Sequence, residues 1–228
     1  FNINREDQDK FALTSQQRTA AAQANGFFAK EIIPVVIPQR KGDPIVVDTD
    51  EHPRASTTAE ALAKLKPVVK AEGTVTAGNA SGINDGAAAL LIASDEAVAQ
   101  HGLKPRAKII GSTVVGVEPR IMGFGPAPAI KKLLVQTGLT LEQMDVIELN
   151  EAFAAQALAC TRDLGIEDGS EKVNPNGGAI ALGHPLGASG ARLVTTALNQ
   201  LEHTGGQYAL CSMCIGVGQG IALIIERV

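Results

Sequence analysis

Short apolar runs that alternate with helical patterns constrain the fold of this chain more than any other feature of its sequence. Four runs have the length and composition of buried strands, at residues 107–117, 146–149, 208–213 and 220–226. Helical patterns that end at glycines lie between them, at residues 125–138, 151–164 and 188–203. Because strands that alternate with helices pack in layers around a sheet, the sequence predicts an α/β layered fold with a mixed sheet.

The first hundred residues are less regular. Helical spacing predicts a helix over residues 5–29 that is interrupted near Gly26, and a short helix over residues 58–65. Between them, residues 38–58 are rich in Pro, Asp and Thr, which is typical of a long surface excursion. Residues 87–93 match a buried strand, and residues 94–102 match a helix that begins at Ser94 as its N-cap.

The composition argues against a nucleic-acid-binding protein. The formal net charge is −4, and the chain has six Phe, one Tyr and no Trp, so it offers neither a basic face nor many rings for stacking bases. No apolar run approaches the roughly 18 residues of a membrane-spanning helix. The N-terminal residues show no secretory pattern, and three Cys in apolar or Gly-rich surroundings favour a reduced, cytoplasmic compartment.

The first segment with candidate chemistry is Asn150-Glu-Ala-Phe-Ala-Ala-Gln156, which follows a strand and enters an alanine-rich helix. One interpretation is structural: Asn150 caps the helix and Glu151 faces the positive end of its dipole. The other is functional: an amide and a carboxylate at the carboxyl end of a strand hold a water or a substrate.

The second segment runs from Asn174 to Arg192 and contains five glycines, two prolines and one histidine, His184. It has neither the Gly-Lys-Ser/Thr ending of a phosphate-binding loop nor the Gly-x-Gly-x-x-Gly pattern of a dinucleotide site. A lone histidine is more often structural. His184, however, is followed by Pro185 in a segment suited to close backbone approach, where an imidazole can act as a base or a hydrogen-bond donor.

The third segment is Cys211-Ser-Met-Cys-Ile-Gly-Val-Gly-Gln-Gly220. A zinc site would require two more ligands at short spacing, and a disulfide-exchange motif would stand at a helix start. On a strand, Cys211 and Cys214 point to opposite faces. Cys214 instead resembles a lone thiol at a strand end, beside backbone N–H groups, such as that of Gly216, that could bind an oxyanion.

Taken together, these segments resemble the catalytic motifs of the thiolase family, the acyl-CoA C-acyltransferases, and they occur in the family's order. Residues 78–86 resemble the family's coenzyme A-binding stretch. Within the family, residues 120–126 and 213–220 are most similar to members that act on 3-oxoadipyl-CoA in the breakdown of aromatic compounds. The resemblance covers essentially the whole chain and implies a three-layered αβα fold.

The resemblance also implies a domain organisation. Residues 1–83 correspond to part of a loop domain that covers the active site, residues 84–104 to the last strand and helix of an N-terminal domain, and residues 105–228 to the C-terminal domain. An internal echo, Gly82-x-x-x-Gly86 and Gly216-x-x-x-Gly220 before apolar runs, fits two related halves. Thiolases carry their nucleophilic Cys in an N-terminal half that this chain lacks, so we expect the chain to be a portion of a longer polypeptide and inactive alone.

The implied reaction is thiolytic cleavage of a 3-oxoacyl-CoA, or the reverse condensation. The resemblance assigns activation of the absent nucleophile to His184, an oxyanion hole to Asn150 and His184, and proton transfer at the substrate's α-carbon to Cys214. Gly216 would contribute a backbone N–H to a second oxyanion hole.

The resemblance further places Ser81 by the pantetheine arm and Arg54 by the adenosine end of coenzyme A. Coenzyme A is then a substrate, no metal or redox cofactor is required, and the whole enzyme is expected to be a homodimer or homotetramer. The competing hypothesis is a non-catalytic thiolase-like module that binds acyl-CoA or pairs with another chain.

Overall fold

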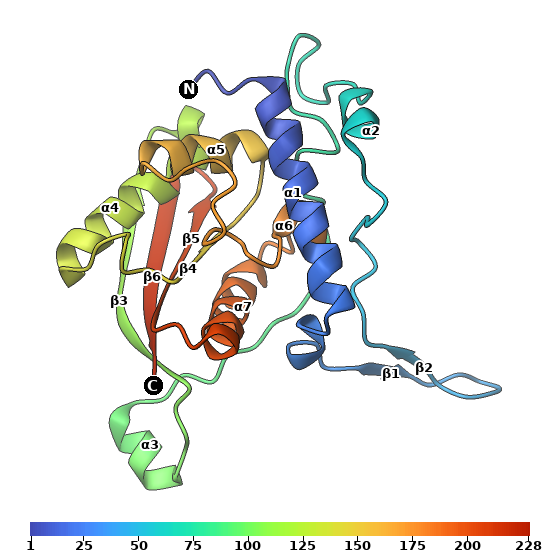
Figure 1. Ribbon diagram of the computed structural model, residues 1–228. Helices are drawn as coiled ribbons and strands as arrows, with labels where there is room; N and C mark the ends of the chain where they lie inside the picture. The colour runs from blue at the N-terminus through green and yellow to red at the C-terminus, as the bar shows by residue number, and fades with distance from the viewer.

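The computed structural model describes residues 1–228 and is built around a four-stranded mixed sheet (Figure 1). The strands lie in the order β3 (Ala107–Gly116), β6 (Gln219–Arg227), β5 (Tyr208–Ile215) and β4 (Val146–Leu149). β6 pairs antiparallel with both of its neighbours, whereas β4 and β5 are parallel. The predicted α/β fold with a mixed sheet is therefore confirmed.

Helices cover both faces of this sheet. One apolar cluster joins the sheet to α4 (Pro126–Thr137) and α5 (Ala154–Asp163), and a second joins it to α7 (Ser189–Thr204). Successive residues of β5 alternate between the two clusters: Leu210 belongs to the first and Cys211 to the second. This alternation makes a three-layered αβα arrangement, in which both layers of helices bury apolar surface on one sheet.

The N-terminal helix α1 (Arg5–Ala24) packs across one side of these layers against α2 (Ala59–Ala63), α5 and the short α6 (Ala179–Leu182) (Figure 1). It ends five residues before the predicted boundary, because Gly26 takes the left-handed conformation (φ 79°) that stops the helix; a 3₁₀ turn follows at Phe28–Lys30. The face that α1 buries is largely polar and includes Gln8, Ser15 and Thr19. None of the helices is both long and apolar enough to cross a lipid bilayer.

The predicted surface excursion, residues 38–58, contains the turn and the second strand of a hairpin, whose first strand lies directly before it. Strands β1 (Val35–Ile37) and β2 (Ile45–Val47) pair antiparallel and project from the body of the molecule (Figure 1). All six strand residues are apolar and exposed.

The prediction of a buried strand over residues 87–93 is wrong for this chain. The segment forms no strand, and Leu91 and Ile92 are 85% and 71% exposed. The physical reason is that a strand needs a neighbour for its backbone hydrogen bonds, and no strand of this chain pairs with the segment. The helix that follows, α3 (Asp95–His101), needs no neighbour: the Ser94 side chain caps it and Gly102 ends it, as predicted.

The turn between β5 and β6 is held against the start of α4. The 3₁₀ segment η2 (Pro119–Phe124) leads into Gly125, whose backbone lies directly against that of Gly220. A Cβ atom at Gly220 would overlap the carbonyl group of Gly125, and neither backbone is free to move away. Gly220 also pairs with Cys214 in the ladder, so this close approach fixes the position of that cysteine.

We expect Gly220→Ala to lower the free energy of unfolding by at least about 1–3 kcal/mol, the usual cost of overpacking. Gly116→Ala is the matched control, because a Cβ atom there meets nothing within 4 Å. Urea unfolding of both variants checks the prediction. Equal stability of the two variants would show that the two backbones are not in contact.

Candidate functional site

The loop after β4 differs from its predicted form in a way that bears on function. Helix α5 begins at Ala154 with Phe153 as its N-cap, three residues later than predicted. Asn150 and Glu151 therefore lie in a loop and are 0% and 1% exposed. The interpretation of Asn150 as a helix cap is wrong, as is that of Glu151 as a first-turn partner of the helix dipole.

The Glu151 carboxylate is a buried junction between three segments. It accepts hydrogen bonds from the Ser15 hydroxyl of α1 (2.7 Å), the Asn174 amide (2.8 Å) and the Ile180 backbone N–H at the start of α6 (3.1 Å). Burial raises the pKa of Glu151, and these donors oppose the rise. The carboxylate thus ties the loop to α1 and α6.

Asn174 fixes the beginning of the same loop. It has a positive φ of 46°, which asparagine tolerates better than most residues, and it is buried. Its side chain accepts from the Leu149 N–H and donates to the Leu149 carbonyl, both at 2.8 Å. The side chain therefore satisfies the last residue of β4 as a neighbouring strand would, and holds the backbone directly before Asn150.

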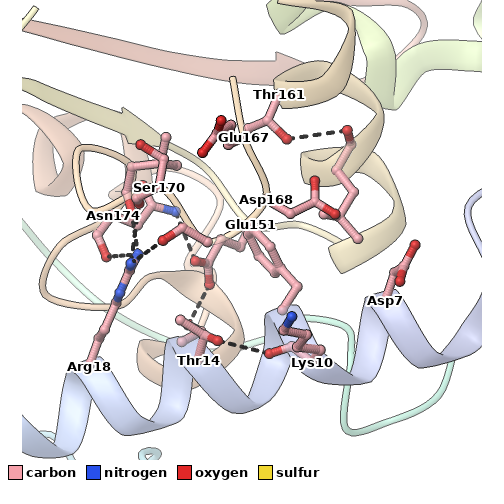
Figure 2. A pocket seen from close by; sticks show the side chains of 15 residues that line it. Asp7, Lys10, Thr14, Arg18, Glu151, Thr161, Glu167, Asp168, Ser170 and Asn174 are labelled. Atoms are coloured by element: carbon pink, nitrogen blue, oxygen red, sulfur yellow. Dashed lines mark hydrogen bonds between the residues drawn. The ribbon is translucent and has the colours of Figure 1, made fainter. Parts of the chain in front are cut away.

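A polar cavity of about 70 Å³ lies beside Glu151, between α1 and the loop of residues 167–174 (Figure 2). Arg18 of α1 points into this loop and donates to four backbone carbonyls at 2.6–3.4 Å, those of Gly169, Ser170, Val173 and Asn174. Asn150, His184 and Cys214 do not line the cavity. Because backbone carbonyls already occupy Arg18, we interpret the cavity as part of the contact between α1 and the sheet domain.

His184 lies between α6 and α7, and both of its ring nitrogens have partners. Nε2 is 3.3 Å from Nδ2 of Asn150, and Nδ1 is 2.6 Å from the hydroxyl of Ser189. Its backbone N–H reaches the carbonyl of Gly82 and the side-chain oxygen of Asn84. The structure therefore brings Asn150 and His184 together across 34 positions of sequence.

The polar atoms of this pair are not all satisfied. Oδ1 of Asn150 is buried and has no hydrogen-bond partner in the protein. An unpaired buried amide oxygen is costly unless a water or a ligand group binds it. The Asn150 amide and the His184 ring can together hold a small polar group.

Burial lowers the pKa of His184, and the nearby Arg192 guanidinium lowers it further. The imidazole is therefore neutral near pH 7 and can accept a proton. Arg192 itself binds Glu148 of β4 at 3.0 Å. Burial raises the pKa of Glu148 to about 8, and Arg192 opposes the rise.

Cys214 lies near the end of β5. The last residue of β4, Leu149, pairs with Ser212 of β5, and the Asn150 N–H donates to the Ser212 carbonyl (2.9 Å). Cys214 is two residues further along β5 than this last pair. It points to the face opposite Cys211, which packs under α7. Burial raises the pKa of the Cys214 thiol, which is therefore protonated near pH 7.

The turn after Cys214 is strained. Val217 has φ 70° and is 84% exposed. A β-branched residue in this conformation costs about 1–3 kcal/mol, and such strain tends to occur at functional sites. The adjacent Gly216 is exposed, and its Cβ position is open space.

The two residues predicted to bind coenzyme A lie in different surroundings. The backbone N–H of Ser81 donates to the Ala152 carbonyl (3.0 Å), which places Ser81 beside the loop that holds Asn150. Arg54 is exposed, and its backbone N–H donates to Gln16 of α1 (2.8 Å). No hydrogen bond joins Arg54 to the Asn150–His184 pair, and its role stays a prediction.

Three residues that hold the site have no role that the sequence motifs predict: Asn84, Asn174 and Ser189. All three fall inside the Gly-rich segments at residues 78–86 and 174–192, where a polar residue is the one signal that the sequence offers. Ser189 is five residues after His184, a spacing that brings it to the ring only because residues 185–189 form a tight turn.

The chain belongs to the thiolase family. Residues 1–96 match the family model described as "Thiolase, N-terminal domain", and residues 103–227 match "Thiolase, C-terminal domain". The resemblance inferred from the motifs is therefore confirmed.

Similar curated proteins include "Beta-ketoadipyl-CoA thiolase" of Acinetobacter baylyi, 84% identical over all of this chain and 57% of the relative. Another is "3-oxoadipyl-CoA/3-oxo-5,6-dehydrosuberyl-CoA thiolase" of Escherichia coli, 60% identical with the same coverage. Among solved structures, the Bacillus anthracis acetyl-CoA acetyltransferase matches with a TM-score of 0.94 and 47% identity, over 99% of this chain and 57% of that chain. The chain thus spans little more than half the length of these relatives.

The buried Glu148 gives a pH prediction. The folded state keeps its proton up to about pH 8, whereas the unfolded state releases it near 4.5. Unfolding in this window releases a proton, so stability falls as pH rises, by at most about 1.4 kcal/mol per pH unit. In urea unfolding, Glu148→Gln should therefore gain stability over the parent from pH 5 to pH 8.

Gln keeps a hydrogen-bonding oxygen for Arg192 but cannot ionise. Glu171→Gln, which removes an exposed carboxylate, is the control, and Glu148→Gln should gain stability relative to it as the pH rises. If Glu148→Gln ran parallel to this control, Glu148 would not hold a proton in the folded state.

Proposed function

We propose that this chain is part of an enzyme that cleaves 3-oxoadipyl-CoA with coenzyme A, giving succinyl-CoA and acetyl-CoA. The proposal includes a homodimeric or homotetrameric enzyme in the cytoplasm whose nucleophilic cysteine lies outside these 228 residues. The observation that supports it best is the buried pair of Asn150 and His184, with one amide oxygen left for a ligand. The names of the similar curated proteins support the choice of acyl group.

In the first half of the reaction, the absent cysteine gives its proton to Nε2 of His184 and attacks the 3-keto carbon. The C2–C3 bond then breaks and leaves the enolate of acetyl-CoA. A water held by Asn150 and His184 stabilises the enolate oxygen, and the Cys214 thiol protonates its carbon. The products are acetyl-CoA and an acyl group on the nucleophilic cysteine.

In the second half, coenzyme A gives its thiol proton to the Cys214 thiolate. The coenzyme A sulfur attacks the acyl carbonyl, and backbone N–H groups, including that of Gly216, bind the oxyanion. Collapse of this intermediate releases the new acyl-CoA and the cysteine thiolate, which takes its proton back from Nε2 of His184. The pKa shifts support these roles, because His184 is neutral and ready to accept a proton while Cys214 is protonated and ready to give one.

The test uses a full-length enzyme that carries these residues, incubated with radiolabelled acetyl-CoA and assayed separately for thiolysis. Cys214→Ser should lose about 10²–10⁴-fold in turnover, because its hydroxyl is a far poorer acid and base, but should still take up label. His184→Ala should lose both activities, since it serves the nucleophile and an oxyanion hole.

Cys211→Ser is the matched control, because this buried thiol lies on the other face of the sheet, and it should keep label and turnover. The 228-residue chain alone should give neither. Normal turnover of Cys214→Ser would move the acid–base role elsewhere, and activity of the chain alone would refute an external nucleophile.

A further inference from the structure

His184 is held by a local arrangement that its proposed role alone does not explain. Pro185 to Ser189 form a helical turn, in which the Ser189 N–H donates to the Pro185 carbonyl at 2.9 Å. The Ser189 hydroxyl, 2% exposed, lies 3.0 Å from the same carbonyl and 2.6 Å from Nδ1 of His184. One hydroxyl thus lies between the imidazole and a carbonyl within six consecutive residues.

We propose that Ser189 is a positioning residue that keeps a proton on Nδ1 of His184 and so leaves Nε2 without a proton, as the base. This inference rests on the proposed function. The hydroxyl has one proton to donate, and the Pro185 carbonyl can only accept. When the hydroxyl donates to that carbonyl, its oxygen accepts from Nδ1–H, and Nε2 carries the lone pair toward Asn150.

The opposite arrangement cannot support the reaction. A hydroxyl that donated to Nδ1 would leave the proton of the neutral ring on Nε2, where no base would remain for the nucleophilic thiol. Once the ring accepts that proton, both nitrogens carry hydrogens and both need acceptors. Only a hydroxyl already turned toward Pro185 can serve the neutral ring and the imidazolium without rearranging.

The charged groups around His184 do not stabilise its imidazolium form, so the hydrogen bond between Nδ1 and Ser189 has to do so. Arg192 lies one turn along α7 from Ser189 and disfavours a positive ring, while Glu148, which binds Arg192, has a raised pKa. The Glu151 carboxylate is occupied by three donors of its own. No carboxylate contacts Nδ1, so Ser189 takes the place that an acid often holds behind a catalytic histidine.

The experiment measures alkylation of the nucleophilic cysteine by iodoacetamide against pH in the full-length enzyme, by mass spectrometry of its peptide, together with thiolysis. Ser189→Ala should move the midpoint of alkylation upward by about one pH unit, a tenfold loss of thiolate at neutral pH. Its kcat should fall about 10- to 100-fold, and Ser189→Thr, which keeps the hydroxyl, should restore most of the loss.

Thr161→Val is the control for a lost buried hydroxyl, because the Thr161 hydroxyl bonds only to the Leu158 carbonyl of its own helix. It should leave the alkylation midpoint and turnover unchanged. A Ser189→Ala enzyme that is less stable but keeps the parent midpoint would overturn the proposal, and so would a Ser189→Thr enzyme that folds but behaves like Ser189→Ala. If His184→Ala kept full turnover, the proposed function itself would fail.

Discussion

The Glu151 carboxylate holds together segments that lie far apart in the sequence, and the geometry of the site follows from it. Its donors are Ser15, 136 positions earlier, and Asn174 and Ile180, 23 and 29 positions later. A buried carboxylate without such donors would be costly, so the three segments are fixed relative to one another. Asn150 precedes Glu151 directly, and its direction toward His184 is set by this junction.

The proposed mechanism combines two uncharged groups with opposite tendencies. Burial lowers the pKa of His184 and raises that of Cys214, so near neutral pH the imidazole is a base and the thiol an acid. Burial therefore favours the proposed proton transfer at both groups, and the pKa shifts of both arise without a neighbouring carboxylate. In our proposal, Ser189 and Asn150 then decide which nitrogen of the ring accepts the proton.

Local signals in the sequence predicted local structure well. Ser94 and Gly102 mark the ends of a helix whose hydrogen bonds are all its own. The strand expected at residues 87–93 depended on a neighbour that the chain does not provide. Asn150 carried a genuine cap signal, but partners from distant segments hold Glu151 in a loop instead. The motifs supplied the residues to which we assign the reaction, whereas the residues that position them became visible only in three dimensions.

The most direct test of the account is a crystal structure of the full-length enzyme with coenzyme A bound. We predict a water or a carbonyl oxygen within hydrogen-bonding distance of both the Asn150 amide and Nε2 of His184. The coenzyme A sulfur should lie beside Sγ of Cys214. A coenzyme A sulfur bound away from Cys214, or an Asn150 amide satisfied by protein groups alone, would contradict the account.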